Sequence, residues 1–500
     1  MKNFKFFLLL PLIGLCLWGF QACTNLEVES TDSVLTPITG TTFAGDGGAL
    51  LVSAYRNLNQ FQDQDQVYSL TEHTTDEMIP PTRGTDWGDN GVWRTLHAHT
   101  WDPTHNYIIG SWNRLNGSIF LCNQVLASTS PAPTAQQAAE AKFLRAFYMF
   151  HVMDFWGKVP FREINEGVEI NPRVFTRSEA FDFVEKDLTE ALPLLPVIGP
   201  GGDATLASQA AANTLLAKLY LNKAVYKSDN PAGPYTFDPA DMAKVISYCD
   251  AVIANGFSLD PDYFHIFKAG ATNETILTAN GNGGSPSNRY HMTLHYDQTG
   301  WNGFTTLAEF YDKFETGDQR KGKDGAKDGT PNSGVGYGFL IGQQYTDSNK
   351  LIINSRDGKP LIYTSDVPLA GANTAQGIRV IKYHNGEFGR YIFLRLGDVW
   401  LMKAEAQLRS GGDALSTVNA LRAVRATSLA PLASIDLAGM LDERGRELYW
   451  EGWRRNDQIR FGTFDDAWSQ KFVTDPTKVL FPIPQQALDS NPNLRQNTGY

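Results

Sequence analysis

The sequence predicts a mainly α-helical protein, a tetratricopeptide-like helical scaffold that carries long loops. Two observations predict this class. Hydrophobic residues recur at steps of three and four along many stretches, which gives each stretch the apolar face of a packed helix. Long segments rich in glycine, asparagine and proline separate these stretches. Loops of that length on a compact scaffold are usually functional or disordered.

The strongest helical patterns lie in the first third of the chain. Residues 107–127 place Trp112, Leu115 and Ile119 on one face, and residues 135–156 are apolar around most of the helix circumference. A helix that is apolar all round must be buried on several sides. Further helices are expected over residues 177–192, 206–226, 241–255, 305–314, 394–409, 413–426 and 437–451.

The turn Gly411-Gly412-Asp413 predicts a helical hairpin. Glycine favours the end of a helix, and Asp413 can cap the start of the next one. Ala404 and Ala414 flank the turn at tetratricopeptide-like spacing, where small residues let two helices approach closely. Several such pairs in one chain would form a helical-repeat scaffold.

Three long loops interrupt the helices, at residues 80–103, 280–300 and 317–391. They are too rich in aromatic residues to be simple linkers. Within the last loop, residues 318–332 are rich in glycine, lysine and aspartate, but they lack the ligand spacing of a calcium loop. We expect that part of the loop to be solvated.

The first 22 residues have the pattern of an export leader. Lys2 and Lys5 precede an apolar run, which ends where Ala22 stands before Cys23. This order predicts a lipoprotein signal with Cys23 as the lipid acceptor. A plain signal peptide cut at another small residue is the alternative. Residues 23–42 are polar and rich in serine and threonine, which predicts a flexible tether.

The net charge, the cysteines and the apolar runs indicate which classes of partner to expect. Loss of the leader removes two of the 43 basic residues and none of the 54 acidic ones, so the net charge falls from −11 to −13. Such a chain is repelled by nucleic acid. After Cys23 only Cys122 and Cys249 remain, so no disulfide framework is expected. No later apolar run is long enough to span a membrane, so we expect membrane attachment through the N-terminal lipid only.

No catalytic motif stands out in the sequence. It lacks a P-loop, a G-x-S-x-G elbow and an H-E-x-x-H helix. Glu443, Glu447 and Glu451 are spaced by four and fall on one helical face, which raises the question of a glycosidase acid pair. Arginines crowd the same segment and would keep these acids ionised, whereas a general acid needs a raised pKa. We therefore expect a structural charge network, with no catalytic set, no metal site and no cofactor.

The loop around Trp87 has the composition of a sugar-binding site. Trp87 stands beside Asp86, Asp89 and Asn90, among glycines that permit tight turns. Sugar rings suit a flat aromatic platform flanked by polar side chains, and so hydrophilic a loop offers little apolar sequence for a tryptophan to bury against. The alternative is that Trp87 folds back on the body.

Other positions are weaker predictions. Trp93 and Trp101 are expected in the core. The second-rank candidate ligand contacts are Asp46, Arg289, Tyr290, Trp301, Arg379 and Tyr391.

Several long sequence blocks resemble the SusD/RagB-like lipoproteins. AEAKFLRAFY at 139–148, followed by FWGKVP at 155–160, is similar to their N-terminal signature helix. LRLGDVWLMKAEA at 394–406 and ERGRELYWEGWRRNDQIR at 443–460 resemble their C-terminal segments. FPIP at 481–484 and NPNLRQNTGY at 491–500 match the family's ending, with Thr498 where a proline is more usual.

This resemblance implies both a fold and a function. It implies tetratricopeptide-like units packed against a loop-rich ligand-binding half, in one compact body with an N-terminal region at 43–230 and a C-terminal region at 231–500. It also implies attachment to the outer membrane, facing the exterior. There the protein would capture oligosaccharides and deliver them to a SusC-like TonB-dependent transporter. The alternatives are capture of peptides by the same architecture and a carbohydrate-active enzyme.

Overall fold

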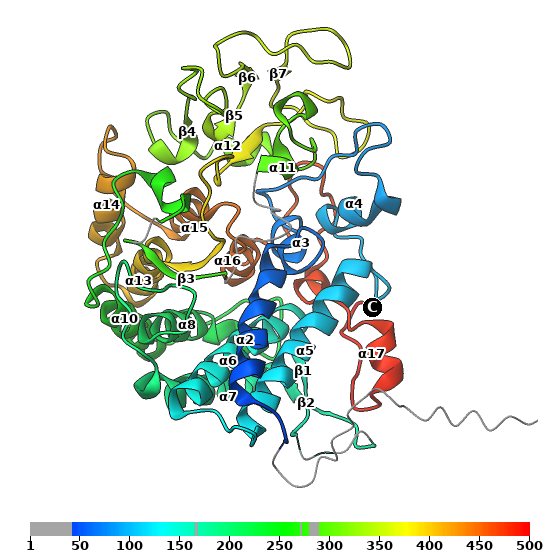
Figure 1. Cartoon of the computed structure of the whole chain (residues 1–500), viewed down its shortest axis with the longest axis vertical. Coiled ribbons are helices and arrows are strands. Elements are labelled where there is room, and N and C mark those ends of the chain that lie inside the picture. The colour runs from blue at the N-terminus through cyan, green and yellow to red at the C-terminus, as the bar shows by residue number, and fades with distance from the viewer. Residues whose placement is uncertain (1–42, 165, 167–168, 271–272, 280–289) are drawn as a thin grey trace, which may run out of the picture. The chain divides into compact units, whose positions relative to one another are not determined.

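The computed structural model describes residues 43–500 except 165, 167–168, 271–272 and 280–289 (Figure 1). The chain divides after Pro37 into two units, and all the described residues belong to the unit that begins at Ile38. The predicted leader, the acceptor Cys23 and the tether lie outside the described residues.

The main helices pack against one another in this unit. α6 packs against α5 and α7, α8 against α10, and α10 against α13. α6 is buried on nearly all sides, as its sequence predicted, and it begins with a capping box between Thr134 and Gln137. The longer helices are α2 (Gly47–Arg56), α5 (Asn106–Ala127), α6 (Ala135–Trp156), α7 (Arg177–Ala191), α8 (Gln209–Leu221) and α10 (Pro239–Ile253).

The C-terminal helices include the predicted hairpin. Gly411 ends α13 with a φ of 77°, and the side chain of Asp413 accepts the amide of Ser416 at the start of α14. α13 and α14 pack against each other, which confirms the hairpin. These helices are α13 (Leu396–Ser410), α14 (Ala414–Arg425), α15 (Leu437–Leu448), α16 (Arg454–Phe461) and α17 (Gln485–Ser490).

Small sheets and short helices lie both among the main helices and in the loop-rich part, which lies above the main helices in Figure 1. The antiparallel pairings are β1 (Lys158–Phe161) with β2 (Arg173–Thr176), β3 (Thr275–Thr278) with β9 (Ile392–Arg395), β5 (Tyr337–Leu340) with both β4 (Gly322–Lys323) and β8 (Arg379–Ile381), and β6 (Gly342–Gln343) with β7 (Ile362–Tyr363). The short helices are α3 (Val67–Glu72), α4 (Val92–His97), α9 (Lys223–Tyr226), α11 (Tyr290–Thr293) and α12 (Ala308–Tyr311). The 3-10 turns are η1 (Asn57–Gln62), η2 (Asp89–Gly91), η3 (Leu192–Leu194), η4 (Tyr263–Phe267), η5 (Tyr296–Gln298), η6 (Gln319–Lys321) and η7 (Pro476–Val479).

One predicted helix is much shorter than expected. Only residues 308–311 of the expected stretch 305–314 form an α-helix. Thr305 and Thr306 instead make bridges to Ile79 and Ile378, so tertiary pairing overrides the local pattern.

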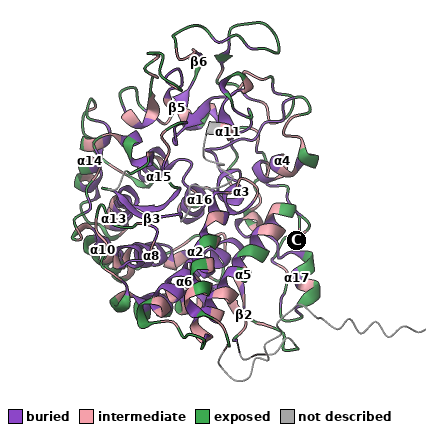
Figure 2. Cartoon of the chain, in the orientation of Figure 1, coloured by how far each residue is buried: buried purple, intermediate pink, exposed green. Residues whose placement is uncertain are grey.

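One large hydrophobic cluster forms the core of the helices, and Figure 2 shows the buried residues concentrated there. A second cluster lies under the loops and includes Leu294, Leu340 and Tyr363. Cys122 and Cys249 are both buried and free, in agreement with the expected lack of a disulfide framework. Among the described residues, no helix combines the length and the apolar character that a membrane span requires.

Candidate functional site

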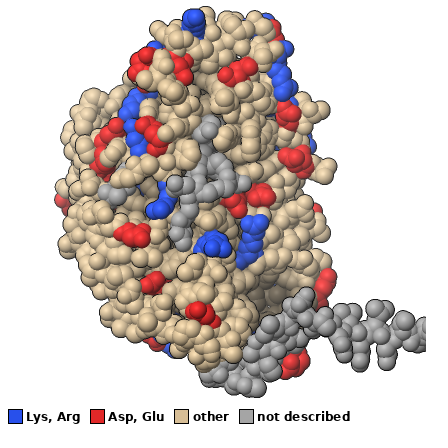
Figure 3. Space-filling model, viewed as in Figure 1, with Lys and Arg blue, Asp and Glu red and all other residues tan. Residues whose placement is uncertain are grey.

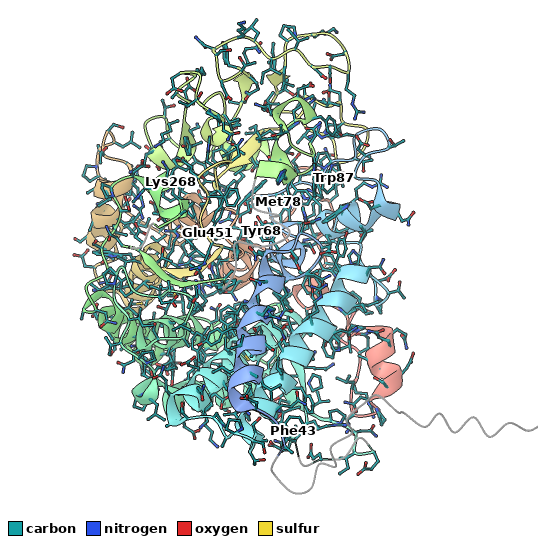
Figure 4. All side chains as sticks on the ribbon, viewed as in Figure 1. Phe43, Tyr68, Met78, Trp87, Lys268 and Glu451 are labelled. Atoms are coloured by element: carbon teal, nitrogen blue, oxygen red, sulfur yellow. The ribbon has the colours of Figure 1, made fainter. Side chains whose placement is uncertain are left out.

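The Trp87 loop is pinned to the loop that carries Trp301. The indole Nε1 of Trp87 donates a hydrogen bond of 2.8 Å to the carbonyl oxygen of Trp301. The ring of Trp87 also packs against Phe304, with centroids 5.1 Å apart, and against Trp93 at 5.6 Å. Trp87 therefore lies half-buried beside α4 (Figure 4). Trp87 thus packs against the body, as the alternative prediction stated, and it remains partly exposed at the surface.

Trp301 provides the exposed aromatic surface of this site. Its side chain is 49% exposed, and its ring lies 5.6 Å from the ring of His291 at an interplanar angle of 30°. Gly303 lets the two tryptophans meet, because a Cβ there would lie 2.6 Å from the Trp87 ring. The structure thus brings a first-rank and a second-rank candidate into one site.

Polar groups flank the two tryptophans. The carboxylate of Asp86 accepts a hydrogen bond from the Tyr296 hydroxyl and lies 3.5 Å from Nη2 of Arg356. The Arg356 guanidinium lies 4.4 Å from the centroid of the Tyr296 ring. Burial and the Asp86 carboxylate raise the pKa of Tyr296 to about 12, so its hydroxyl stays protonated at neutral pH. We call Asp86, Trp87, Tyr296, Trp301 and Arg356 the Trp301 site.

Two buried arginines hold the loops beneath the Trp301 site. Nε of Arg83 donates to the carbonyl of Asn302 at 2.8 Å, and Nη2 of Arg379 donates to Oδ1 of the same residue at 2.7 Å. Both guanidiniums also donate to the carbonyl of Gln376 at 2.8 Å. Burial lowers the pKa of Arg83 to about 8 and that of Arg379 to about 10, since neither guanidinium has a carboxylate partner among the described residues, and the nearby charge of Arg379 lowers the pKa of Arg83 further. Arg379 is fully buried, so it supports the site instead of contacting a ligand as expected.

The remaining candidates divide into three groups. Asp89 and Asn90 are exposed, and Asp89 accepts the indole Nε1 of Trp93 at 2.7 Å. Trp93 and Trp101 are buried, as predicted. Arg289 lies outside the described residues, as does the side chain of Tyr290.

Asp46 and Tyr391 correct the sequence-based expectation. Asp46 caps α2, since its carboxylate accepts the amides of Gly48 at 2.9 Å and Ala49 at 3.1 Å. Tyr391 is 3% exposed, and its ring packs against Phe393 in the core. Tyr391 is therefore closed to a ligand, whereas Asp46 is exposed and serves as the N-cap of α2.

The sequence analysis missed Tyr296 and Arg356. Tyr296 lies five positions before Trp301, within the long aromatic loop that had been singled out. Arg356 is far along the chain, and no spacing rule links it to Asp86. Only the folded structure brings these two residues together.

The glutamates of the C-terminal segment form the predicted charge network. Glu447 lies 2.7 Å from Arg395, 3.1 Å from Arg425 and 3.2 Å from Arg320. Glu443 pairs with Arg320 at 2.8 Å, and Lys382 pairs with Glu451 at 2.6 Å. Figure 4 shows Glu451 in the interior of the body.

This network does not suit acid catalysis. Burial alone would raise the pKa of Glu443, but the surrounding arginines lower it to about 2. Arginines likewise hold the pKa of Glu447 well below its usual range. Permanently ionised carboxylates cannot donate a proton as a general acid at neutral pH. Among the described residues, no group of three or more His, Cys, Asp or Glu side chains could hold a metal ion.

Comparisons with known proteins agree with this architecture. Residues 28–221 match the family described as "Starch-binding associating with outer membrane", and residues 382–500 match the one described as "SusD family". The chain belongs to the SusD/RagB family. It is 26% identical to the starch-binding protein SusD of Bacteroides thetaiotaomicron, over 98% of each chain.

Solved structures share the fold of this SusD/RagB chain. A laminarin-binding SusD-like protein superposes with a TM-score of 0.68 at 22% identity, over 92% of this chain and all of that one. Surface glycan-binding protein A of Bacteroides thetaiotaomicron, solved with laminarihexaose, gives a TM-score of 0.65 at 20% identity, over 90% of this chain and 98% of that one. These relatives are named as binding proteins.

Proposed function

We propose that this SusD/RagB family member captures oligosaccharides at the Trp301 site. The observation that carries the proposal is the half-exposed Trp301 ring, fixed through its backbone to Trp87 and flanked by the polar groups of Asp86, Tyr296 and Arg356. An aromatic face can cover the C–H face of a sugar ring, while the carboxylate, hydroxyl and guanidinium can bond to its hydroxyls. The names of the relatives support a saccharide as the class of ligand.

The size of the site suggests weak capture. Burying a whole tryptophan removes about 150–250 Å² from water, a gross gain of about 4–6 kcal/mol. Trp301 is already half covered, so a ligand gains only about half of that, and ordering and desolvation offset part of the remainder. Micromolar-type affinity suits a protein that must release its ligand to a transporter.

The proposal includes a place in the cell. Acylation at Cys23 would anchor the body to the outer membrane on the exterior face, with residues 23–42 as the tether. A SusC-like TonB-dependent transporter would then receive the captured saccharide, as the family resemblance implies. In this role the protein binds without catalysing a reaction.

A glycan array probed with the purified protein tests the class of ligand. We expect hits among neutral oligosaccharides and no product release from any of them. Absence of glycan hits together with retention of peptides would favour the peptide-capturing alternative, and product release would overturn the non-enzymatic assignment. Copurification of a TonB-dependent transporter from outer membranes tests the partner, and its consistent absence would contradict that part of the proposal.

A further inference from the structure

A hollow lies in the loop-rich part, apart from the Trp301 site. Its volume is about 460 Å³, within the range of small-molecule pockets, and residues 316–327 and 334–345 form most of its wall. Lys321, Lys323 and Lys327 line it together with Tyr311 and Tyr345. Figure 3 shows basic side chains next to acidic ones around the place where β4 and β5 lie in Figure 1.

Glycines shape this hollow by letting backbone segments pass close to each other. A Cβ on Gly325 would lie 2.4 Å from the carbonyl oxygen of Ser333, and one on Gly334 would lie 2.5 Å from that of Tyr345. Gly322 has a φ of 133°, and a Cβ there would lie 2.3 Å from the Tyr337 carbonyl. The walls therefore depend on glycine at these positions, and their shape is built into the backbone.

Aromatic rings hold two of the lysines at the wall. Nζ of Lys321 lies 4.2 Å from the centroid of the Tyr311 ring, and Nζ of Lys327 lies 4.3 Å from that of Tyr345. Such cation–π contacts position an ammonium group without neutralising its charge. Lys327 also adopts a φ of 54°, which a non-glycine residue rarely does and which is typical of constrained functional positions.

Two of the three lysines at the wall, Lys321 and Lys327, carry charges that are poorly compensated, whereas Lys323 pairs with Asp262 at 3.0 Å. Lys321 donates to the carbonyl of Phe314 at 2.8 Å and has no carboxylate partner among the described residues. Lys327 lies 3.7 Å from Asp324, whose side chain is 94% exposed, so solvent screens the pair. Asp318, the other acid of the wall, points its carboxylate to Arg320 at 2.6 Å. A positive hollow on a chain of net charge −11 suits an anionic ligand.

We propose that this hollow, the lysine cleft, binds an acidic saccharide, one that carries carboxylate or sulfate groups. The ammonium groups of Lys321 and Lys327 would meet the anionic substituents. The side-chain oxygen of Gln343, which also lines the cleft, would accept a hydrogen bond from a sugar hydroxyl. This inference rests on the proposed function only in taking the ligand to be a saccharide. The residues of the lysine cleft are separate from those of the Trp301 site.

Titration calorimetry on the full chain tests the lysine cleft. The probes are a tetramer of galacturonic acid, a sulfated tetrasaccharide and neutral laminarihexaose. We expect the double variant Lys321→Met/Lys327→Met to weaken binding of at least one acidic probe by about tenfold or more, since it removes two poorly compensated cations. About 0.5 M salt should weaken that binding in the wild type, while the affinity for laminarihexaose stays unchanged.

Two control variants keep the test decisive. Lys186→Met removes one positive charge at a residue whose side chain is 70% exposed on α7, and it should leave all affinities unchanged. Lys321→Arg/Lys327→Arg retains the charges and should retain acidic binding, which separates loss of charge from loss of fold. The inference is overturned if no acidic probe binds, or if the methionine variant binds both within about twofold of wild type. Failure of the proposed Trp301 site would give a different result. Neutral laminarihexaose would then either not bind the wild type or bind it with an affinity that does not depend on Trp301.

Discussion

Replacing Glu447 by glutamine removes one negative charge from the buried network of the C-terminal segment. Arg395, Arg425 and Arg320 all lie within 3.2 Å of the Glu447 carboxylate. The side chains of these four residues are at most 1% exposed, so water cannot replace the lost partner. The substitution preserves size and leaves one net positive charge in the interior.

The expected loss of stability follows from these contacts. A pair of unit charges about 4 Å apart contributes about 4 kcal/mol at an effective dielectric constant of about 20. The three arginines keep other acids, among them Glu274, Glu443 and Glu451, and these partly compensate the loss. Removing one partner of a buried ion pair typically destabilises a protein by about 3–5 kcal/mol, and we expect Glu447→Gln to fall in that range.

Urea unfolding of wild type and variant measures this difference through the midpoint and the slope. Glu190→Gln is the matched control, because Glu190 pairs with Lys142 at 2.7 Å but is 43% exposed. That exposed pair should contribute at most about 1 kcal/mol. A change of less than about 1 kcal/mol in Glu447→Gln would refute the structural role assigned to the network.

Three further predictions concern other parts of the chain. Gly303→Ala should displace Trp87, because the new Cβ would lie 2.6 Å from its ring. Calorimetry should then show a several-fold fall in saccharide affinity. Gly117→Ala is the control and should leave the affinity unchanged, because the new methyl group would lie in open space. Burial raises the pKa of Glu72 and that of the neighbouring carboxyl of Glu77 above the ordinary value, so the neutral form of this pair stabilises the fold fully below pH 4.5, and this contribution is lost as the pH rises from there through the raised pKa values. Unfolding of Glu72→Gln should show a weaker pH dependence over that window, and an unchanged profile would contradict the assignment. Labelled palmitate should be incorporated into wild type and not into Cys23→Ser, and label that persists in the variant would move the acceptor elsewhere.

The sequence predicted the helical framework because amphipathic spacing is a local property. α6 and the hairpin at Gly411 depend on residues within one or two turns, and both are confirmed. The position of Asp46 directly before a helical stretch is that of a preferred N-cap, and the structure shows it in this role. The sequence analysis instead interpreted Asp46 as a ligand contact.

The site depends on contacts that no local pattern encodes. An arginine in a polar loop is ordinarily a surface residue, yet Arg379 is buried because the carbonyl of Gln376 and the side chain of Asn302 satisfy its guanidinium. Trp87 and Trp301 are more than two hundred positions apart and meet through one backbone carbonyl. The composition of each loop could identify it as a candidate for ligand binding, but only the fold shows that Trp301, not Trp87, offers the larger exposed face.

The most direct test of the account is a calorimetric titration of Trp301→Ala with the strongest neutral oligosaccharide from the array. Phe472→Ala is the matched control, since that aromatic side chain is 80% exposed and lies outside the Trp301 site. We predict that Trp301→Ala lowers the affinity by about tenfold or more, through loss of the apolar contact, and that Phe472→Ala leaves it unchanged. Equal affinities for wild type and Trp301→Ala would contradict the claim that this site captures the saccharide.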